Sequence, residues 1–262
     1  MNDIITTKDQ PSSLFDGDES QAFGLGINDA SIFVPSPAAV QSGFRLSELL
    51  PQSQSGLTSG VTTFHFSLIK DLQKPLNLSH EYQLAFVTTN DGTHVFEIKY
   101  GTRWFNSSNL PSVDVNSADR LLLMDTNTIG YDKTKVLFAV PFTPNKFHNF
   151  AVTIDWDKAT LAAYYSQCND PLQMVVPVTA NPLKKPGEFH VGILKLPVGA
   201  AQSVVFHGFQ DAGIQESIIY GGIFVEDSTD GTVTTEPMSY SERCKLGGVL
   251  MILQCFYESD SK

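Results

Sequence analysis

The chain has few charged residues and no excess of basic ones. Its 17 Lys and Arg residues stand against 28 Asp and Glu residues, which gives a formal net charge of −11 over 262 residues. Nucleic-acid binding depends on clustered Lys and Arg that neutralise phosphates, and anionic membrane surfaces attract the same side chains. The charge balance therefore argues against nucleic-acid and membrane partners, and it suits a neutral ligand.

Long hydrophobic runs are also missing. The longest, GGVLMILQCFY, covers residues 247–257 and is shorter than the roughly 20 residues that a bilayer span needs. The opening residues, MNDIITTKDQPSS, have neither the basic start nor the apolar core of a signal peptide. Two sequons, at Asn77 and Asn106, permit a secretory route without establishing one.

Cysteine is scarce, with only Cys168, Cys244 and Cys255 present. An odd number allows at most one disulfide; a Cys244–Cys255 bridge and three free thiols both remain open. The cysteine spacing matches no zinc motif, and the acidic stretch FDGDES at 15–20 is more typical of a solvated loop than of a calcium site. A P-loop, a dinucleotide fingerprint and a G-x-S-x-G motif are absent as well. We therefore expect no cofactor and no metal.

Strand patterns dominate what is present. Period-two alternation or short apolar runs occur in TTFHFSLIK (62–70), HEYQLAFVTT (80–89), THVFEIKYG (93–101), GEFHVGILKLP (187–197) and SIIYGGIFVED (217–227). In the second of these, the alternation places Tyr82, Leu84 and Phe86 on one face. Residues 146–166 predict a hairpin with its turn at 155–158, whereas 118–125 fits a short helix or a strand. The pattern predicts an all-β fold, an antiparallel β-jelly-roll sandwich.

The chain shows no internal repeat and no linker long enough to divide it. We expect a flexible N-terminal segment at 1–13 and one β-jelly-roll catalytic domain at 14–236. After FVEDSTDG the strand pattern stops, so 237–262 is interpreted as a C-terminal extension of unknown role.

Two glutamates lie inside strand patterns, where a carboxylate is unusual. Glu48 follows Arg45 in GFRLSELL, and Glu97 is flanked by His94 and Lys99. Two carboxyl groups on one sheet face can divide acid and base roles in sugar chemistry. The plainer reading is a solvated strand face, and residues three apart point to opposite faces of a regular strand. Arg45 and Glu48 would share a face only if that strand bulges or bends.

Six blocks occur in an order and spacing that resemble those of one known family. They are FRLSELLPQ, TTFHFSLIK, HEYQLAFVTTNDGTHVFEIKYG, FHNFAVTIDWDKATLAAYYS, FHVGILKLP and IIYGGIFVED, and the resemblance covers roughly residues 14 to 230. Each block alone is weak, and their common order makes the match specific. The sequence resembles glycoside hydrolase family 131, the fungal broad-specificity β-glucanases.

The resemblance implies a jelly roll with an open cleft on its concave face. It also implies a secreted glycosidase that hydrolyses β-1,3-, β-1,6- and β-1,4-linked glucans with inversion, and we expect a monomer. Matched motif by motif, the family's functional residues fall on Arg45, Glu48, Glu97 and His190, which we take as the catalytic group. We assign substrate binding to Tyr82, Gln83, His94, Lys99, Tyr100, Trp104 and Lys195.

The neighbours of the two glutamates suggest how they divide the work. Lys99 beside Glu97 would keep that carboxylate ionised as the base, which leaves Glu48 as the acid. The sequence departs from the family between Tyr82 and His94, where residues are inserted. Two alternatives stay open: a jelly-roll polysaccharide lyase in which Arg45 neutralises a uronate while Tyr82 or His190 acts as base, and a non-catalytic glucan-binding protein.

Overall fold

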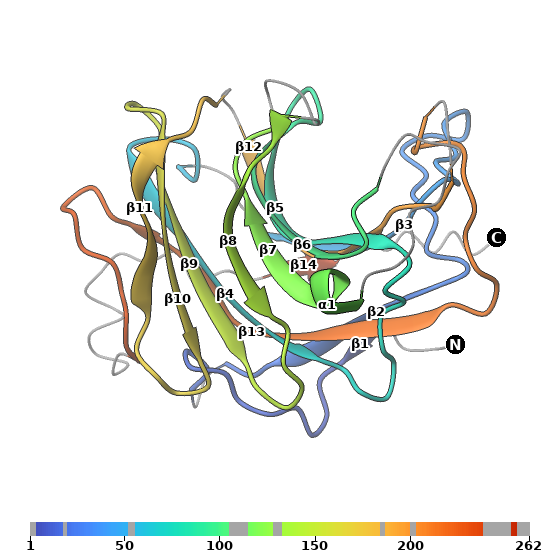
Figure 1. Ribbon diagram of the computed structural model, residues 1–262, viewed down its shortest axis with the longest axis horizontal. Helices are drawn as coiled ribbons and strands as arrows, with labels where there is room; N and C mark the ends of the chain where they lie inside the picture. The colour runs from blue at the N-terminus through green and yellow to red at the C-terminus, as the bar shows by residue number, and fades with distance from the viewer. Residues whose placement is uncertain are drawn as a thin grey trace.

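The chain folds into two seven-stranded antiparallel sheets that pack face to face (Figure 1). The computed structural model describes residues 4–17, 20–51, 56–104, 115–127, 133–183, 187–199 and 203–237, and the backbone of 253–255. The predicted all-β jelly-roll sandwich is confirmed. We call the sheets the outer sheet and the inner sheet, because the inner one curls so that its free face is concave (Figure 1).

The strands of each sheet come from distant parts of the chain. The outer sheet has the order β1 (Ile5–Thr6), β2 (Phe23–Asn28), β13 (Gln215–Asp227), β4 (Val61–Lys70), β9 (His148–Asp155), β10 (Thr160–Gln167) and β11 (Gln173–Ala180). The inner sheet has the order β14 (Leu253–Cys255), β3 (Arg45–Pro51), β12 (Gly187–Lys195), β5 (Glu81–Thr89), β6 (His94–Gly101), β7 (Arg120–Met124) and β8 (Val136–Pro141). Neighbours far apart in sequence, such as β3 and β12, are what a jelly roll requires.

The core lies between the sheets and follows the alternation seen in the sequence. Phe64, Phe66 and Leu68 of β4 are fully buried in it, as predicted. The predicted β9–β10 hairpin forms, with its turn at 156–159, one residue later than expected. The ambiguous stretch at 118–125 forms strand β7, preceded by the short helix α1 (Val115–Ala118). Burial of a side chain as large as that of Phe64 or Phe66 stabilises the fold by roughly 1.5–3 kcal/mol.

The alternation expected for β5 fails at one point. The pairing of β5 with β6 shifts between Gln83 and Ala85, and again between Val87 and Thr88. Each shift marks a β-bulge, which reverses the face on which later residues lie. Tyr82 and Leu84 therefore belong to the core, whereas Phe86 pairs with Glu97 and stacks on histidines outside that core. The prediction that Phe86 shares the face of Tyr82 was wrong for this reason.

Part of the free face of the outer sheet is covered by the chain itself. Leu14 and Phe15 pack there against Ala151 and Leu172, and Phe15 meets the rings of both His65 and Phe224. The Asp16 carboxylate, from the acidic stretch, accepts the N–H groups of Ser13 and Gly222. This cover leaves the concave face of the inner sheet as the place to look for a site.

The chain ends join the sheets in different ways. Strand β1 pairs with β2 at the edge of the outer sheet, and β14 pairs with β3 at the edge of the inner sheet. The considered Cys244–Cys255 bridge lies outside the described residues, while Cys168 is free and exposed. Within the described part of the chain, no helix is long and apolar enough to span a membrane. The expected domain boundaries stay predictions.

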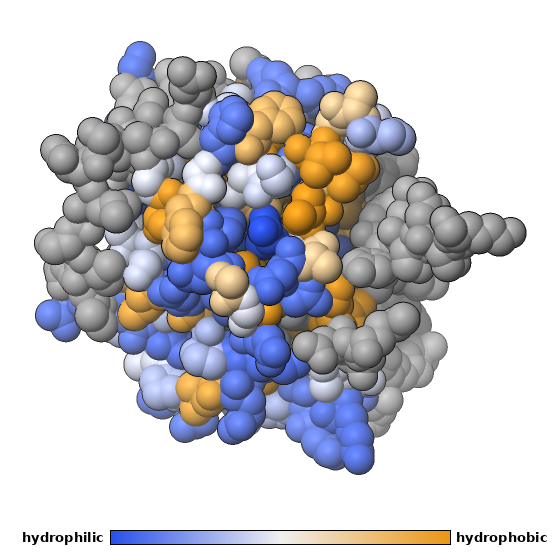
Figure 2. Space-filling view, turned by 90° about the vertical axis from the view of Figure 1, so that its right-hand side faces the viewer, coloured by the Kyte–Doolittle hydropathy of each residue, from blue (hydrophilic) through white to orange (hydrophobic). Residues whose placement is uncertain are grey.

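Two loops on the right of Figure 1 lie beside the concave face. They precede β3 and follow β12, and they join where the N–H of Gly43 donates to the carbonyl of Val205 over 2.9 Å. Figure 2 views this side: polar side chains occupy its middle, and apolar ones gather above them. Among the exposed large apolar side chains of these loops are Phe33, Val34, Val40, Phe206 and Phe209.

Candidate active site

Glu48 and His190 meet on the concave face across strands β3 and β12. Glu48 pairs in register with Gly192, and Oε2 of Glu48 lies 2.9 Å from Nδ1 of His190. A Cβ atom added at Gly192 would lie 2.7 Å from Cα and Cβ of Glu48, closer than real side chains approach. The glycine therefore lets Glu48 lie close against β12, which brings its carboxylate within reach of His190.

Glu97 and His94 form a second pair on β6. Nδ1 of His94 lies 2.8 Å from Oε2 of Glu97. Residues three apart would point to opposite faces of a regular strand, but the bulge between Val87 and Thr88 falls opposite this part of β6. The irregularity that the sequence required for Arg45 and Glu48 therefore occurs here, in a different strand pair.

Lys99 completes the environment of Glu97. Its Nζ lies 3.1 Å from Oε1 of Glu97 and 2.8 Å from Oε1 of Glu81. Burial alone would raise the pKa of the Glu97 carboxyl, but Lys99 and His94 together lower it below its usual value. Glu97 is thus a fully buried carboxylate that stays ionised, because its two oxygens face an ammonium group and an imidazole.

The two Glu–His pairs are connected by an aromatic ring. The ring centroid of Phe86 lies 4.7 Å from that of His94 and 4.8 Å from that of His190, with interplanar angles of 19° and 12°. The three rings form one continuous stack across β6, β5 and β12. Read across the sheet, the order of groups is Glu48, His190, Phe86, His94, Glu97.

Several of the residues predicted from the sequence lie together on this face. Glu48, His190, His94, Glu97 and Lys99 form the contacts described above. Gln83 pairs in register with Lys99, and directly opposed residues of antiparallel strands point to the same face. Trp104 is connected to the group through its backbone, since its N–H donates to Oε2 of Glu81 over 2.7 Å.

Arg45 does not join Glu48. The pairing of β3 with β12 runs without a shift from Arg45 to Leu49, so this part of the strand has no bulge. The Arg45 guanidinium instead donates through Nη1 to the carbonyls of Ser42 and Phe44. In a regular strand Arg45 lies on the face opposite Glu48, where it holds the start of β3.

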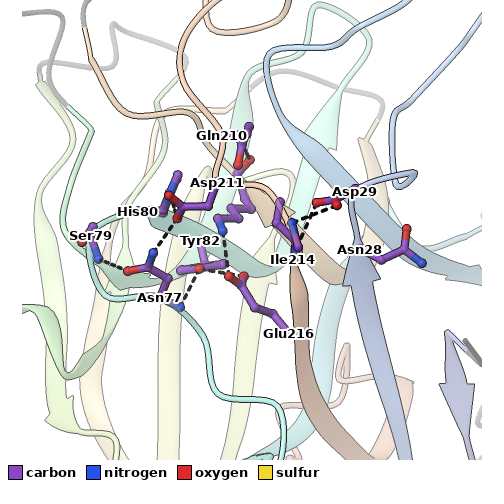
Figure 3. Close-up of polar contacts among 12 residues, drawn as sticks. Asn28, Asp29, Asn77, Ser79, His80, Tyr82, Gln210, Asp211, Ile214 and Glu216 are labelled. Atoms are coloured by element: carbon purple, nitrogen blue, oxygen red, sulfur yellow. Dashed lines mark hydrogen bonds and ion pairs between the residues drawn. The ribbon is translucent and has the colours of Figure 1, made fainter.

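Tyr82 and Lys195 lie between the sheets rather than on the concave face. The Tyr82 hydroxyl donates to Oε2 of Glu216 over 2.8 Å, and Lys195 pairs with Oε1 of the same residue over 2.7 Å. Figure 3 shows Tyr82 and Glu216 pointing toward each other, with Asn77 beside them. Burial and Glu216 raise the pKa of Tyr82 far above its usual value, which disfavours Tyr82 as a base.

Tyr100 faces the core as well. It pairs with Tyr82 in register, and its hydroxyl donates to Oδ1 of Asp119 over 2.8 Å. Tyr82, Tyr100 and Lys195 were predicted to bind substrate, and the structure does not bring them to the group around Glu48 and Glu97. Each is accounted for by a contact that supports the sandwich.

Sequence reasoning missed Phe86 and Glu81. Phe86 looked like a core residue because alternation across an unseen bulge gave it the face of Tyr82. Glu81 begins β5 and accepts hydrogen bonds from Lys99 and from the Trp104 backbone. A carboxylate near the start of a strand carried no distinguishing sequence signal, since most such residues are solvated.

Comparison with known proteins identifies the family of the chain. Residues 1–231 match the family model described as the glycoside hydrolase 131 catalytic N-terminal domain. A crystal structure of a GH131 beta-glucanase catalytic domain from Podospora anserina is similar with a TM-score of 0.62 and 23% identity, covering 82% of this chain and 74% of that one. The catalytic domain of the glycoside hydrolase family 131 protein from Coprinopsis cinerea gives 0.58 and 22%, covering 82% and 72%. No curated protein matches the chain.

Proposed function

Since the chain belongs to glycoside hydrolase family 131, it is a glycosidase of the β-glucanase type, and we propose that it cleaves β-1,3-, β-1,6- and β-1,4-linked glucans with Glu48 and Glu97 as its two carboxylates. The observation that carries this proposal is the difference between the two environments. Glu97 is fully buried between Lys99 and His94, whereas the Glu48 side chain is 16% exposed and contacts only a histidine in the hydrogen bonds described. Unequal environments let two carboxyl groups take opposite roles.

Glu97 is the general base. Its lowered pKa keeps it ionised, so it holds no proton to donate to a leaving group. The Glu97 side chain is fully buried, whereas that of His94 is 10% exposed and its Nδ1 lies 2.8 Å from Oε2 of Glu97. Glu97 therefore acts through His94: the imidazole takes a proton from the water that attacks the anomeric carbon and passes its Nδ1 proton to Glu97.

Glu48 is the general acid, and His190 shares its proton. In the acid form the Glu48 O–H donates to Nδ1 of His190 across the 2.9 Å contact. When a sugar is bound, that proton goes to the leaving glycosidic oxygen and the electron pair of the broken C–O bond stays on that oxygen. Water supplies the hydroxyl of the new reducing end, and its proton goes to His94, which passes its Nδ1 proton to Glu97.

The strand order supports inversion. Glu48 and Glu97 lie on β3 and β6, which β12 and β5 separate. Three strand spacings of about 4.8 Å put their backbones about 14 Å apart on a flat sheet. Inverting enzymes need about 6.5–9.5 Å between the carboxyl groups, to leave room for water, whereas retaining enzymes need about 5–5.5 Å. Strands this far apart favour the wider separation of the two carboxyl groups, which is the one that inversion requires.

We also propose that the protein acts outside the cell as a monomer on β-glucan polysaccharides. Glucan polysaccharides are too large to enter cells, so an enzyme that cleaves them acts outside the cell. One of the two sequons is unavailable without rearrangement, because the Asn77 amide donates to Oδ2 of Asp211 over 2.7 Å. Recovery of the protein from the culture medium of a eukaryotic host tests secretion, and gel filtration of that protein tests whether it is a monomer.

The direct test uses four glucans of different linkage. The protein is incubated with laminarin, pustulan, lichenan and carboxymethylcellulose, and the products are identified for wild type, Glu48→Gln and Glu97→Gln. We expect oligosaccharides or glucose from at least the first three glucans, and their loss in both variants. Binding of laminarin without release of reducing ends would overturn the proposal in favour of a non-catalytic glucan-binding protein.

A further inference from the structure

The ring of Phe86 lies between the two Glu–His pairs, and we propose that it is a positioning residue for both of them. This inference rests on the proposed function, because it assigns a role within the same site. Phe86 lies opposite Glu97 in register, but its ring faces stack on the two imidazoles, so it acts through His94 and His190. Its role is to fix the orientation of each imidazole. The ring orientation in turn determines where the N–H group of each histidine points.

The geometry of the stack restricts both histidines. Near-parallel rings with centroids 4.7 and 4.8 Å apart lie in the offset-stacked range that aromatic pairs favour. Phe86 is 4% exposed, so both of its faces are occupied and its own ring has little room to turn. Each histidine is thus held at two points, by Phe86 on the ring face and by a glutamate at Nδ1.

Ring orientation matters most for His190. Its side chain is 9% exposed, and its buried Nε2 has no hydrogen-bond partner within the described part of the chain. The exposed carboxylate of Glu188 lies 3.9 Å from Nε2, beyond hydrogen-bond distance. A buried N–H or ring nitrogen without a hydrogen-bond partner destabilises the fold. A bound ligand that supplies the missing hydrogen bond removes this cost. With Nδ1 directed at Glu48, the ring plane fixed by Phe86 determines where Nε2 points.

Proton counting gives the atom a defined role. In the state that can act as acid, the Glu48–His190 pair holds one dissociable proton more than the ionised carboxylate with a neutral imidazole. Whether that proton lies on Glu48 or on Nδ1, Nε2 carries a hydrogen. The geometry therefore makes Nε2–H a donor to a sugar oxygen next to the bond that breaks, but only while Phe86 holds the ring.

The backbone on the other side of the stack is held independently. The Asn127 side chain accepts the N–H of His94 over 2.5 Å, and Thr126 donates to its carbonyl over 3.1 Å. Loss of the Phe86 ring would consequently leave the strand in place and free only the imidazole. A purely structural role for Phe86 would show itself as lost stability instead.

Phe86→Leu tests the inference, because leucine keeps most of the apolar volume and removes the flat ring. We expect kcat on laminarin to fall by about 10²-fold, the size of effect that follows a small misplacement of catalytic groups, with KM changed by less than about threefold. In ¹⁵N NMR spectra the ring signals of His94 and His190 should lose the separate Nδ1 and Nε2 shifts of a fixed tautomer. Phe86→Tyr, which keeps the ring, should restore both properties.

Phe224→Leu is the matched control. On the outer sheet the Phe224 ring stacks on His65 with centroids 4.1 Å apart, and His65 pairs with Glu226 over 2.7 Å, so the same kind of contact is removed away from the site. This variant should keep kcat. If Phe86→Leu keeps both wild-type kcat and wild-type histidine spectra, the inference is wrong. If wild type itself is inactive but Phe86→Leu still changes the two spectra, the proposed function fails and the positioning role stands.

Discussion

Nδ1 of His190 lies 2.9 Å from Oε2 of Glu48, although the two residues are 142 positions apart in the chain. The contact depends on the antiparallel pairing of β3 with β12 and on the missing side chain at Gly192. Glu97 has a similar histidine contact, but Lys99 adds a positive charge. The site thus contains two Glu–His pairs that differ by one ammonium group.

Glu48→Gln should separate substrates by their leaving groups. An acid is needed to protonate a sugar leaving group but not a dinitrophenolate, which leaves without a proton. We expect kcat/KM on laminarin to fall by about 10²–10⁴-fold and the rate on a dinitrophenyl β-glucoside to stay near that of wild type. Glu97→Gln should impair both substrates, since water must be activated in either case. Equal loss on both substrates in Glu48→Gln would contradict its assignment as the acid.

Lys99→Met should move the acid side of the pH–activity profile. Lys99 lowers the pKa of Glu97, so without it the carboxylate takes up a proton at higher pH. We expect the acid limb of kcat/KM to shift upward by about one pH unit or more. Lys70→Met, which removes a different ion pair, with Asp119, provides the comparison. An unshifted acid limb in Lys99→Met would show that Glu97 is not the titrating base.

Gly192→Ala should damage the site through Glu48. The added Cβ would lie 2.4 Å from the carbonyl oxygen of Ser47 and 2.7 Å from Cα of Glu48, so β3 must move away from β12. We expect overpacking to cost about 1–3 kcal/mol of stability and kcat to fall at least tenfold. Gly24→Ala serves as the control, because its Cβ meets nothing closer than 3.5 Å. Unfolding in urea and laminarin kinetics measure the two effects, and matching results for the two variants would contradict the account.

His148 predicts how stability depends on pH. Burial, with Lys70 and Lys146 nearby, lowers the pKa of His148 to about 4, while its Nε2 accepts the N–H of Thr143 over 3.2 Å. The unfolded chain therefore takes up this proton first, and the stabilisation present above pH 6.5 is lost as the pH falls to about 4. The shift of about 2.5 pKa units corresponds to about 3 kcal/mol.

Urea unfolding of wild type and His148→Gln at pH 7 and pH 4 checks this expectation. Glutamine can still accept the Thr143 N–H, but it does not titrate. We expect the loss of unfolding free energy between the two pH values to be smaller in His148→Gln by about 3 kcal/mol. Parallel losses in the two proteins would rule out His148 as the group responsible.

The sequence predicts the fold and part of the site, but it does not reveal where the strand pairing becomes irregular. Glu48, His190, His94, Glu97 and Lys99 lie together as their motifs suggested. The bulges that reverse β5 and β6 are invisible in the alternation of apolar residues, so Phe86 was placed on the same face as Tyr82. A residue of the other sheet contacts the backbone at two irregular positions. The Tyr220 hydroxyl of β13 lies 3.1 Å from the carbonyl of Leu84 and 2.7 Å from that of Gly192, both where strand pairing shifts.

Polar residues inside the sandwich were the second limit. Tyr82 and Lys195 have side chains that suit sugar binding, and nothing in their own strands reveals that Glu216 lies opposite them in the other sheet. The prediction that Arg45 joins Glu48 required an irregular strand, but the pairing of β3 with β12 stays in register. Each failure concerns a partner supplied by tertiary structure, which period-two patterns do not contain.

The most direct test of the central claim is the anomeric configuration of the first product. Laminarin is hydrolysed by wild-type protein in an NMR tube, and the anomeric protons are followed before mutarotation equilibrates them. A wide Glu48–Glu97 site with water between the carboxylates predicts that the α-anomer appears first. Initial release of the β-anomer would contradict the account, because it requires one carboxylate to attack the sugar directly.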